Sequence, residues 1–164
     1  MSLKAVLLNG ASSSGKSTLA KLLQEYIKND RKEEYEIISI DNFLNITVDE
    51  PIYEDDVFEI SPVLCKRALG VLKNGRGVII DHVITSERIY KQLTEALAEY
   101  TMIKIQIVCP LKELEKREQE RKNRCVGSAK ASHEYLYPKI GYDSVLNTFE
   151  LSYEECAKEI CEFL

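Results

Sequence analysis

The stretch that decides the fold is Gly10-Ala11-Ser12-Ser13-Ser14-Gly15-Lys16-Ser17, which fits the pattern G-x-x-x-x-G-K-[ST] without a mismatch. An apolar run of strand length, residues 3–8, precedes it. Residues 18–27 follow it, with apolar side chains at helical spacing. Strand, glycine loop and helix in this order are the context of a phosphate-binding loop. We therefore predict a nucleoside triphosphate site here.

Each residue type in this loop suits phosphate binding. Gly10 and Gly15 permit backbone angles that a side chain would obstruct, so the loop N–H groups can turn toward phosphate oxygens. The helix that starts near Thr18 adds its dipole. Lys16 is expected to reach the β- and γ-phosphates, and the Ser17 hydroxyl is expected to ligate Mg²⁺. The alternative is an accidental match in a turn, and the correct flanking segments argue against it.

The composition is that of one globular domain spanning residues 1–164, with 45 % hydrophobic and 30 % charged residues. The net charge of −5 leaves no basic surplus and argues against a nucleic-acid partner. No apolar run is long enough for a membrane span, and Met1 and Ser2 lead into the first strand without a signal peptide, so we expect a cytoplasmic protein. The five cysteines form no C-x-x-C pair, which argues against a zinc site.

Strand and helix patterns alternate along the rest of the chain. We expect strands at residues 35–40, 77–81 and 102–108, and helices at 61–73, 86–100, from 111 and from 152. Residues 45–60 are expected to form a long irregular loop, with Ser61-Pro62 starting the next helix. Glu155 completes a capping box with Ser152. This alternation predicts an α/β fold with a parallel sheet.

Ligands of parallel sheets bind beyond the carboxyl ends of the strands. Gly10, Asp41, Asp81 and Cys109 all fall at such predicted ends. Asp41 is placed to take a hydroxyl proton in phosphoryl transfer, and a turn cap is the alternative. Asp81 ends an apolar strand in the manner of an aspartate that holds Mg²⁺, with a strand-end cap as the alternative. His82 is adjacent and could contact substrate.

Three arginines, Arg117, Arg121 and Arg124, recur at i, i+4 and i+7 and are expected to share one helix face. Guanidinium groups suit phosphate and the charge that develops on a transferred group. The alternative is a solvated face on which the interleaved glutamates pair with them: Glu113, Glu115, Glu118 and Glu120. Further on, an aromatic-rich segment could wall a substrate pocket or pack the last helix: His133, Tyr135, Tyr137 and Tyr142.

With these residues the chain resembles the chloramphenicol phosphotransferase-like family of P-loop kinases over most of its length. The similarity rests on the Gly10 to Ser17 loop, Asp41 with Phe43-Leu44, Val78-Ile79-Ile80-Asp81-His82-Val83, Val108-Cys109-Pro110-Leu111, the Arg117 to Arg124 run with Gly127 and Ala129, Tyr142-Asp143, and Tyr153-Glu154-Glu155-Cys156-Ala157.

The resemblance implies a three-layer P-loop kinase fold, with helices on both faces of the sheet and an arginine-bearing lid at about residues 112–130. It implies ATP- and Mg²⁺-dependent phosphorylation of a small-molecule hydroxyl, with Asp41 as catalytic base and a chloramphenicol-like acceptor linked to antibiotic resistance. Substrate contacts are expected from Asp41, Phe43, His82, His133 and Tyr137.

Two departures from the family pattern lie in the expected substrate or lid region. The family tends to carry His where this chain has Tyr137, and Leu146-Asn147-Thr148 stands where it usually has Val-Asp-Thr. The acceptor could therefore be a nucleoside, a sugar or a shikimate-like metabolite. A nucleotide-dependent switch is a further alternative, although the chain has no Asn-Lys-x-Asp motif for guanine. The oligomeric state stays open.

Overall fold

A computed structural model describes residues 3–164 of the chain; Met1 and Ser2, which the sequence analysis placed directly before the first strand, lie outside the described residues. The strands are β1 (Lys4–Gly10), β2 (Tyr35–Ser39), β3 (Gly77–His82), β4 (Thr101–Val108) and β5 (Ser144–Asn147). The helices are α1 (Lys16–Arg31), α2 (Glu54–Lys73), α3 (Glu87–Ala96), α4 (Leu111–Arg121), α5 (Ser128–Tyr135) and α6 (Tyr153–Cys161), with a short 3-10 helix, η1 (Ile40–Phe43).

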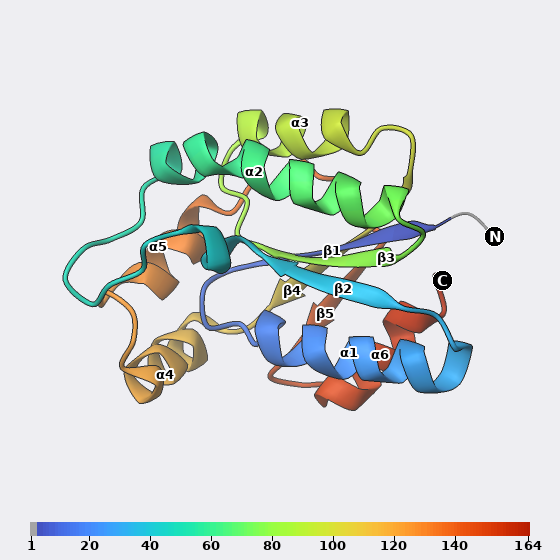
Figure 1. Ribbon diagram of the computed structural model, residues 1–164. Coiled ribbons are helices and arrows are strands. Elements are labelled where there is room, and N and C mark those ends of the chain that lie inside the picture. Colours follow the sequence, from blue (N-terminus) through green and yellow to red (C-terminus); the bar gives the residue numbers. More distant parts are fainter. Residues whose placement is uncertain (1–2) are drawn as a thin grey trace.

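The five strands form one parallel sheet in the order β2-β3-β1-β4-β5. The neighbouring strands β1 and β3 carry continuous apolar runs because both faces of the sheet are covered there. Helices α2 and α3 lie on one face and α1 and α6 on the other, each pair with its own buried cluster (Figure 1). Helices α4 and α5 lie beyond the carboxyl ends of the strands (Figure 1). The predicted three-layer α/β arrangement is confirmed.

The capping box predicted for the last helix is also confirmed. The Ser152 hydroxyl accepts a hydrogen bond from the Glu155 N–H at 3.1 Å, and the Glu155 carboxylate accepts one from the Ser152 N–H at 2.8 Å. These two bonds satisfy donors that a helix start otherwise leaves free. Helix α6 therefore begins where the sequence pattern placed it.

The predicted loop at residues 45–60 is wrong in its second half, because α2 begins at Glu54 rather than at Ser61. The Asp56 carboxylate accepts a hydrogen bond from the Tyr53 N–H at 2.9 Å at the start of the helix, and three acidic residues in its first turn suit the helix dipole. Pro62 therefore lies inside α2 instead of opening it. The irregular segment is confined to residues 44–53.

Other boundaries differ where the segments are short or polar. Helix α3 ends at Ala96, four residues before the predicted end. Helix α5 and strand β5 were not predicted as elements. Each buries a single side chain, Ala129 in α5 and Leu146 in β5, so the hydrophobic pattern that marks longer elements is missing.

Candidate active site

A cavity of about 1010 Å³ opens at the carboxyl edge of the sheet. It is lined by the glycine loop, by η1 and the first turns of α2, by the end of β3, and by the lid, which we define as residues 111–135 of α4, α5 and their connection. Parallel strands deliver these segments to one edge. Lys16, Asp41, Asp81 and all three predicted arginines line this one cavity.

The glycine loop has the backbone that the motif predicts. Gly15 has a φ of +93° and Ser13 a φ of +70°, the left-handed conformations that turn successive N–H groups inward. A Cβ on Gly15 would collide with the Tyr153 ring. The buried Ser14 hydroxyl has no hydrogen-bond partner within residues 3–164. An orphaned hydroxyl in such a loop is suited to a phosphate oxygen.

Lys16 is folded back onto this loop. Its side chain is 6 % exposed, and its Nζ donates to the Ala11 carbonyl at 2.9 Å. Burial lowers the pKa of Lys16, while the nearby Asp81 and Asp41 carboxylates oppose that shift. An ammonium group with so little solvation gains strongly from an incoming anion.

The Asp81 carboxylate is the centre of a small hydrogen-bond cluster. Its Oδ2 accepts from the Ser17 hydroxyl at 2.8 Å and from the Ser39 hydroxyl at 3.3 Å. Strand pairing brings the members of this cluster together. Ser39 lies beside Asp81 in the β2–β3 register, and Asp81 lies beside Leu8 in the β3–β1 register. Asp81 is only 4 % exposed, so its one open side faces the cavity at Ser17.

Asp41 lies in η1, two residues beyond the end of β2. The Ser39 hydroxyl accepts a hydrogen bond from the Asp41 N–H at 3.3 Å and so fixes the start of η1. The Asp41 Oδ2 accepts from Arg124 at 2.8 Å, an ion pair across the cavity between η1 and the lid. The two side chains are 35 % and 12 % exposed, so the arginine is the better buried partner.

The arginines do not share one helix face as predicted. Lys122 adopts a left-handed conformation, with a φ of 55°, and ends α4 at Arg121, so Arg124 lies in the following connection. Arg121 donates to the Ser13 hydroxyl at 3.3 Å, and burial lowers the pKa of Arg121, with neighbouring Arg124 adding to the shift. Because the backbone turns at Lys122, Arg121 contacts the glycine loop at Ser13 whereas Arg124 contacts Asp41.

Arg117 connects three parts of the molecule. It donates to the Ser14 carbonyl at 3.3 Å, to the Thr148 hydroxyl at 3.2 Å and to the Thr148 carbonyl at 3.2 Å. Glu113, one turn earlier in α4, accepts from its Nε at 3.1 Å. The Thr148 hydroxyl itself donates to the Ser14 carbonyl at 2.6 Å. The glycine loop is therefore held from both α4 and the segment after β5.

The alternative interpretation of this helix was that its glutamates pair with the arginines, but Glu118 does not. It is 5 % exposed, and its carboxylate accepts from the Gly127 N–H at 3.2 Å and the Ala129 N–H at 2.8 Å. The carboxylate therefore caps the start of α5, where helix N–H groups are free and the dipole favours negative charge. Glu118 joins α4 and α5 into one unit.

The predicted substrate contacts other than Asp41 lie outside the cavity lining among residues 3–164: Phe43, His82, His133 and Tyr137. His82 is 0 % exposed, and its Nδ1 accepts from the Val83 N–H at 2.9 Å. Burial lowers the pKa of His82 to about 3, so the ring is neutral. The Tyr137 ring packs against Tyr90, with centroids 5.9 Å apart, and His133 is exposed on α5.

Sequence reasoning missed Ser39, Thr148 and Ser132 as site residues. The Ser132 hydroxyl, on α5, accepts from the Ser12 N–H at 2.9 Å and ties the lid to the glycine loop. Ser39 had a usable signal, since it stands at the end of the predicted strand before Asp41. Thr148 was named only within the Leu146-Asn147-Thr148 segment, without a role, and Ser132 gave no signal, because their contacts depend on the unpredicted β5 and α5.

The arrangement of the loop, sheet and lid is that of P-loop kinases, and solved structures with the same fold cover nearly the whole chain. The APS kinase CysC of Mycobacterium tuberculosis, solved with AMPPNP and APS, is 21 % identical with a TM-score of 0.77, covering 98 % of this chain and 96 % of that one. A gluconokinase from Sinorhizobium meliloti is 15 % identical with a TM-score of 0.74, at 97 % and 90 % coverage. The tunicamycin resistance protein of Deinococcus radiodurans is 14 % identical with a TM-score of 0.66, at 98 % and 95 % coverage.

The sequence itself identifies the family. Residues 3–164 match the model of the chloramphenicol phosphotransferase-like proteins, and the chain belongs to that family. No curated protein matches the sequence. The family and the fold together make this chain a small-molecule kinase of the P-loop class. Across residues 3–164, no helix has the length and apolar character needed to cross a bilayer.

Proposed function

We propose that this chain transfers the γ-phosphate of ATP to a hydroxyl group of a small molecule, with a neutral, chloramphenicol-like acceptor favoured. The observation that carries the proposal is the meeting of Lys16, Asp41 and Arg124 in one cavity, where Asp41 pairs with Arg124 at 2.8 Å. Membership of a phosphotransferase-like family favours this enzyme over the nucleotide-dependent switch.

The residues present fit a triphosphate with Mg²⁺. The glycine-loop N–H groups, the orphaned Ser14 hydroxyl and Lys16 supply donors for phosphate oxygens. Ser17 and Asp81 supply the oxygen ligands that Mg²⁺ prefers, and residues 3–164 hold no cluster of three His, Cys, Asp or Glu that could bind a metal alone. A cation held by one carboxylate needs the phosphates as further ligands, and when bound it neutralises their charge.

The proposed step is a direct displacement at phosphorus. The Asp41 carboxylate accepts the proton of the acceptor hydroxyl while the hydroxyl oxygen of the acceptor bonds to the γ-phosphorus. The bond from this phosphorus to the β,γ-bridging oxygen breaks and ADP is released. Lys16 and Arg121 stabilise charge on the phosphates, and Arg124 moves from Asp41 toward the transferred group. Positioning and charge stabilisation supply most of the acceleration.

The cavity lining supports a neutral acceptor with an apolar body. Several of the exposed large hydrophobic side chains of the described residues line this cavity: Ile52, Tyr53, Val126 and Tyr135. The cations in the lining, Lys16 and the three arginines, all belong to the glycine loop and the lid. An acceptor that is itself an anion would compete with ATP for these groups, which disfavours shikimate-like metabolites.

The test is chloramphenicol phosphorylation measured by mass spectrometry, with Asp41→Asn as the variant. We expect the variant to bind a non-hydrolysable ATP analogue normally in calorimetry and to lose transfer by a factor of at least 10², the usual contribution of a general base. Asp49→Asn, at an exposed carboxylate in the adjoining loop, is the matched control and should keep full activity.

Undiminished transfer by Asp41→Asn would refute the base assignment. Absence of phosphorylated chloramphenicol with the wild-type enzyme would refute the favoured acceptor. A panel of nucleosides, sugars and hydroxy acids, assayed in the same way, would then identify the acceptor of the kinase.

A further inference from the structure

The amino-terminal segment of α2, residues 54–61, forms one wall of the cavity on the acceptor side. Glu54 and Val57 belong to the lining, together with Tyr53 immediately before the helix. Val57 is 7 % exposed and packs into the core, whereas Tyr53 is 64 % exposed. The position of this segment therefore sets the width of the cavity beside Asp41.

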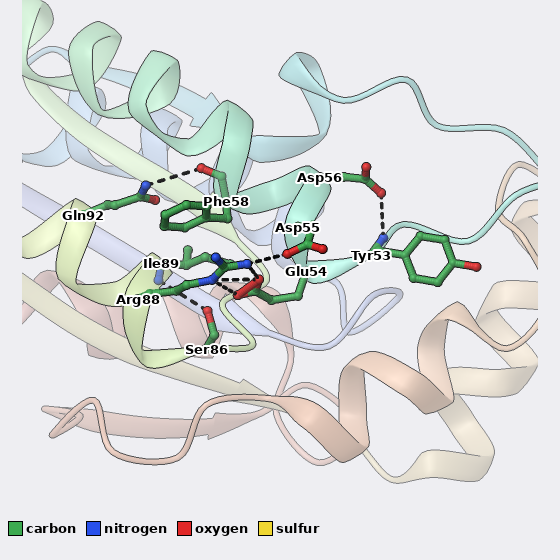
Figure 2. Close-up of polar contacts among 9 residues, drawn as sticks. All are labelled: Tyr53, Glu54, Asp55, Asp56, Phe58, Ser86, Arg88, Ile89 and Gln92. Atoms are coloured by element: carbon green, nitrogen blue, oxygen red, sulfur yellow. Dashed lines mark hydrogen bonds and ion pairs between the residues drawn. The ribbon is translucent and has the colours of Figure 1, made fainter.

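Pro62 separates this segment from the rest of α2. Proline has no N–H, so the Phe58 carbonyl, four residues earlier, cannot accept the usual helical hydrogen bond from residue 62. Gln92 on α3 replaces that partner, because its side-chain amide donates to the Phe58 carbonyl at 3.3 Å (Figure 2). A contact from another helix thus substitutes for a missing bond of the α2 backbone.

Arg88, also on α3, holds the same segment more strongly. Its Nε donates to both carboxylate oxygens of Glu54, at 3.0 and 2.8 Å, and a terminal nitrogen pairs with Asp55 at 2.6 Å. Its guanidinium carbon lies 3.8 Å from the centroid of the Phe58 ring. Figure 2 shows the guanidinium between Glu54 and Phe58, with the Tyr53 ring directed away from it.

Among the described residues, Arg88 forms the ion pairs between residues 54–58 and α3, and Gln92 donates the hydrogen bond to the Phe58 carbonyl. Neither of these two residues lines the cavity in the described part of the chain. Their effect on the site is therefore transmitted through α2. A bidentate arginine pair with a stacked ring is also better ordered than a single surface ion pair.

We propose that Arg88 and Gln92 are positioning residues for the acceptor, which fix the amino-terminal segment of α2 against α3 across the break at Pro62. The inference rests on the proposed function for its link to the acceptor, and on geometry alone for its link to α2. Loss of Arg88 loosens residues 54–61, which Val57 still anchors in the core, while the carboxyl-terminal part of α2, beyond Pro62, stays packed on the sheet. The nucleotide half of the cavity is unaffected.

Hydrogen–deuterium exchange of the full chain tests the structural link without any acceptor. In Arg88→Gln we expect the amides of residues 54–61 to exchange on the order of fivefold faster, with those of residues 64–73 unchanged. Lys91→Gln is the matched control, since Lys91 forms an exposed pair with Glu87 on the same helix and should change neither region. Equal exchange of residues 54–61 in Arg88→Gln and wild type would overturn the inference.

Steady-state kinetics with chloramphenicol tests the functional link. Arg88→Gln should raise the KM for chloramphenicol about fivefold and leave the KM for ATP unchanged, and Arg88→Lys, which keeps the charge but not the planar fork, should recover part of the loss. An unchanged KM for chloramphenicol in Arg88→Gln overturns the positioning role. If the wild-type enzyme does not use chloramphenicol, the acceptor proposal fails, and the exchange result alone decides whether Arg88 holds α2.

Discussion

Thr148→Val removes one hydroxyl from the connection between the glycine loop and the segment after β5. The Thr148 hydroxyl donates to the Ser14 carbonyl at 2.6 Å and accepts from Arg117 at 3.2 Å, and the residue is 7 % exposed. Valine keeps the shape of the side chain, but the Ser14 carbonyl and the Arg117 guanidinium each lose one hydrogen bond in a buried site. We expect a loss of about 1–2 kcal/mol in the free energy of unfolding, the usual cost of such a buried deletion.

For a domain of this size, that loss corresponds to a fall in Tm of roughly 3–6 °C. Urea denaturation followed by circular dichroism measures it directly. Thr94→Val is the control, because the Thr94 hydroxyl donates only to the Tyr90 and Lys91 carbonyls of its own helix, at 3.1 and 3.2 Å. Equal stability of the two valine variants would show that the Thr148 contacts do not hold the glycine loop.

Three further predictions concern the loop, the lid and the buried histidine. Gly15→Ala should weaken binding of an ATP analogue by at least tenfold in calorimetry, because φ is +93° and the new methyl meets the Tyr153 ring. Glu118→Gln should cost about 1–2 kcal/mol in urea denaturation, since one acceptor of the Gly127 and Ala129 N–H groups is lost. Burial lowers the pKa of His82 from 6.5 to about 3, so the unfolded chain binds the proton more readily. Stability should therefore be intact above pH 6.5 and fall by about 1.4 kcal/mol per pH unit between there and pH 3, and His82→Leu should remove this slope in metal-free buffer.

The parts of the fold that follow from local patterns were predictable. The glycine loop, the apolar central strands and the Ser152 capping box each have a signal within a few residues, and all three are present. The carboxyl-edge rule then placed Asp41 and Asp81 beside the loop without any knowledge of side-chain positions. The order of strands and helices was sufficient to place these two carboxylates beside the glycine loop.

What failed depended on contacts between distant segments. Pro62 looked like a helix start because proline commonly opens helices, and only the Gln92 amide from α3 explains how it fits inside α2. The first turn of α5 is capped by Glu118, for which the sequence pattern offered only pairing with the arginines, as the alternative to a phosphate-binding face. Arg124 left the predicted helix because Lys122 took a left-handed backbone, a choice that no residue type nearby required.

The carboxylate that joins α4 to α5 has a consequence for how the cavity opens. Because Glu118 binds the Gly127 and Ala129 N–H groups, we expect α4 and α5 to move together, with Arg117 held to Ser14 and Thr148. Relaxation-dispersion spectra of α4 and α5 should then share a single exchange rate.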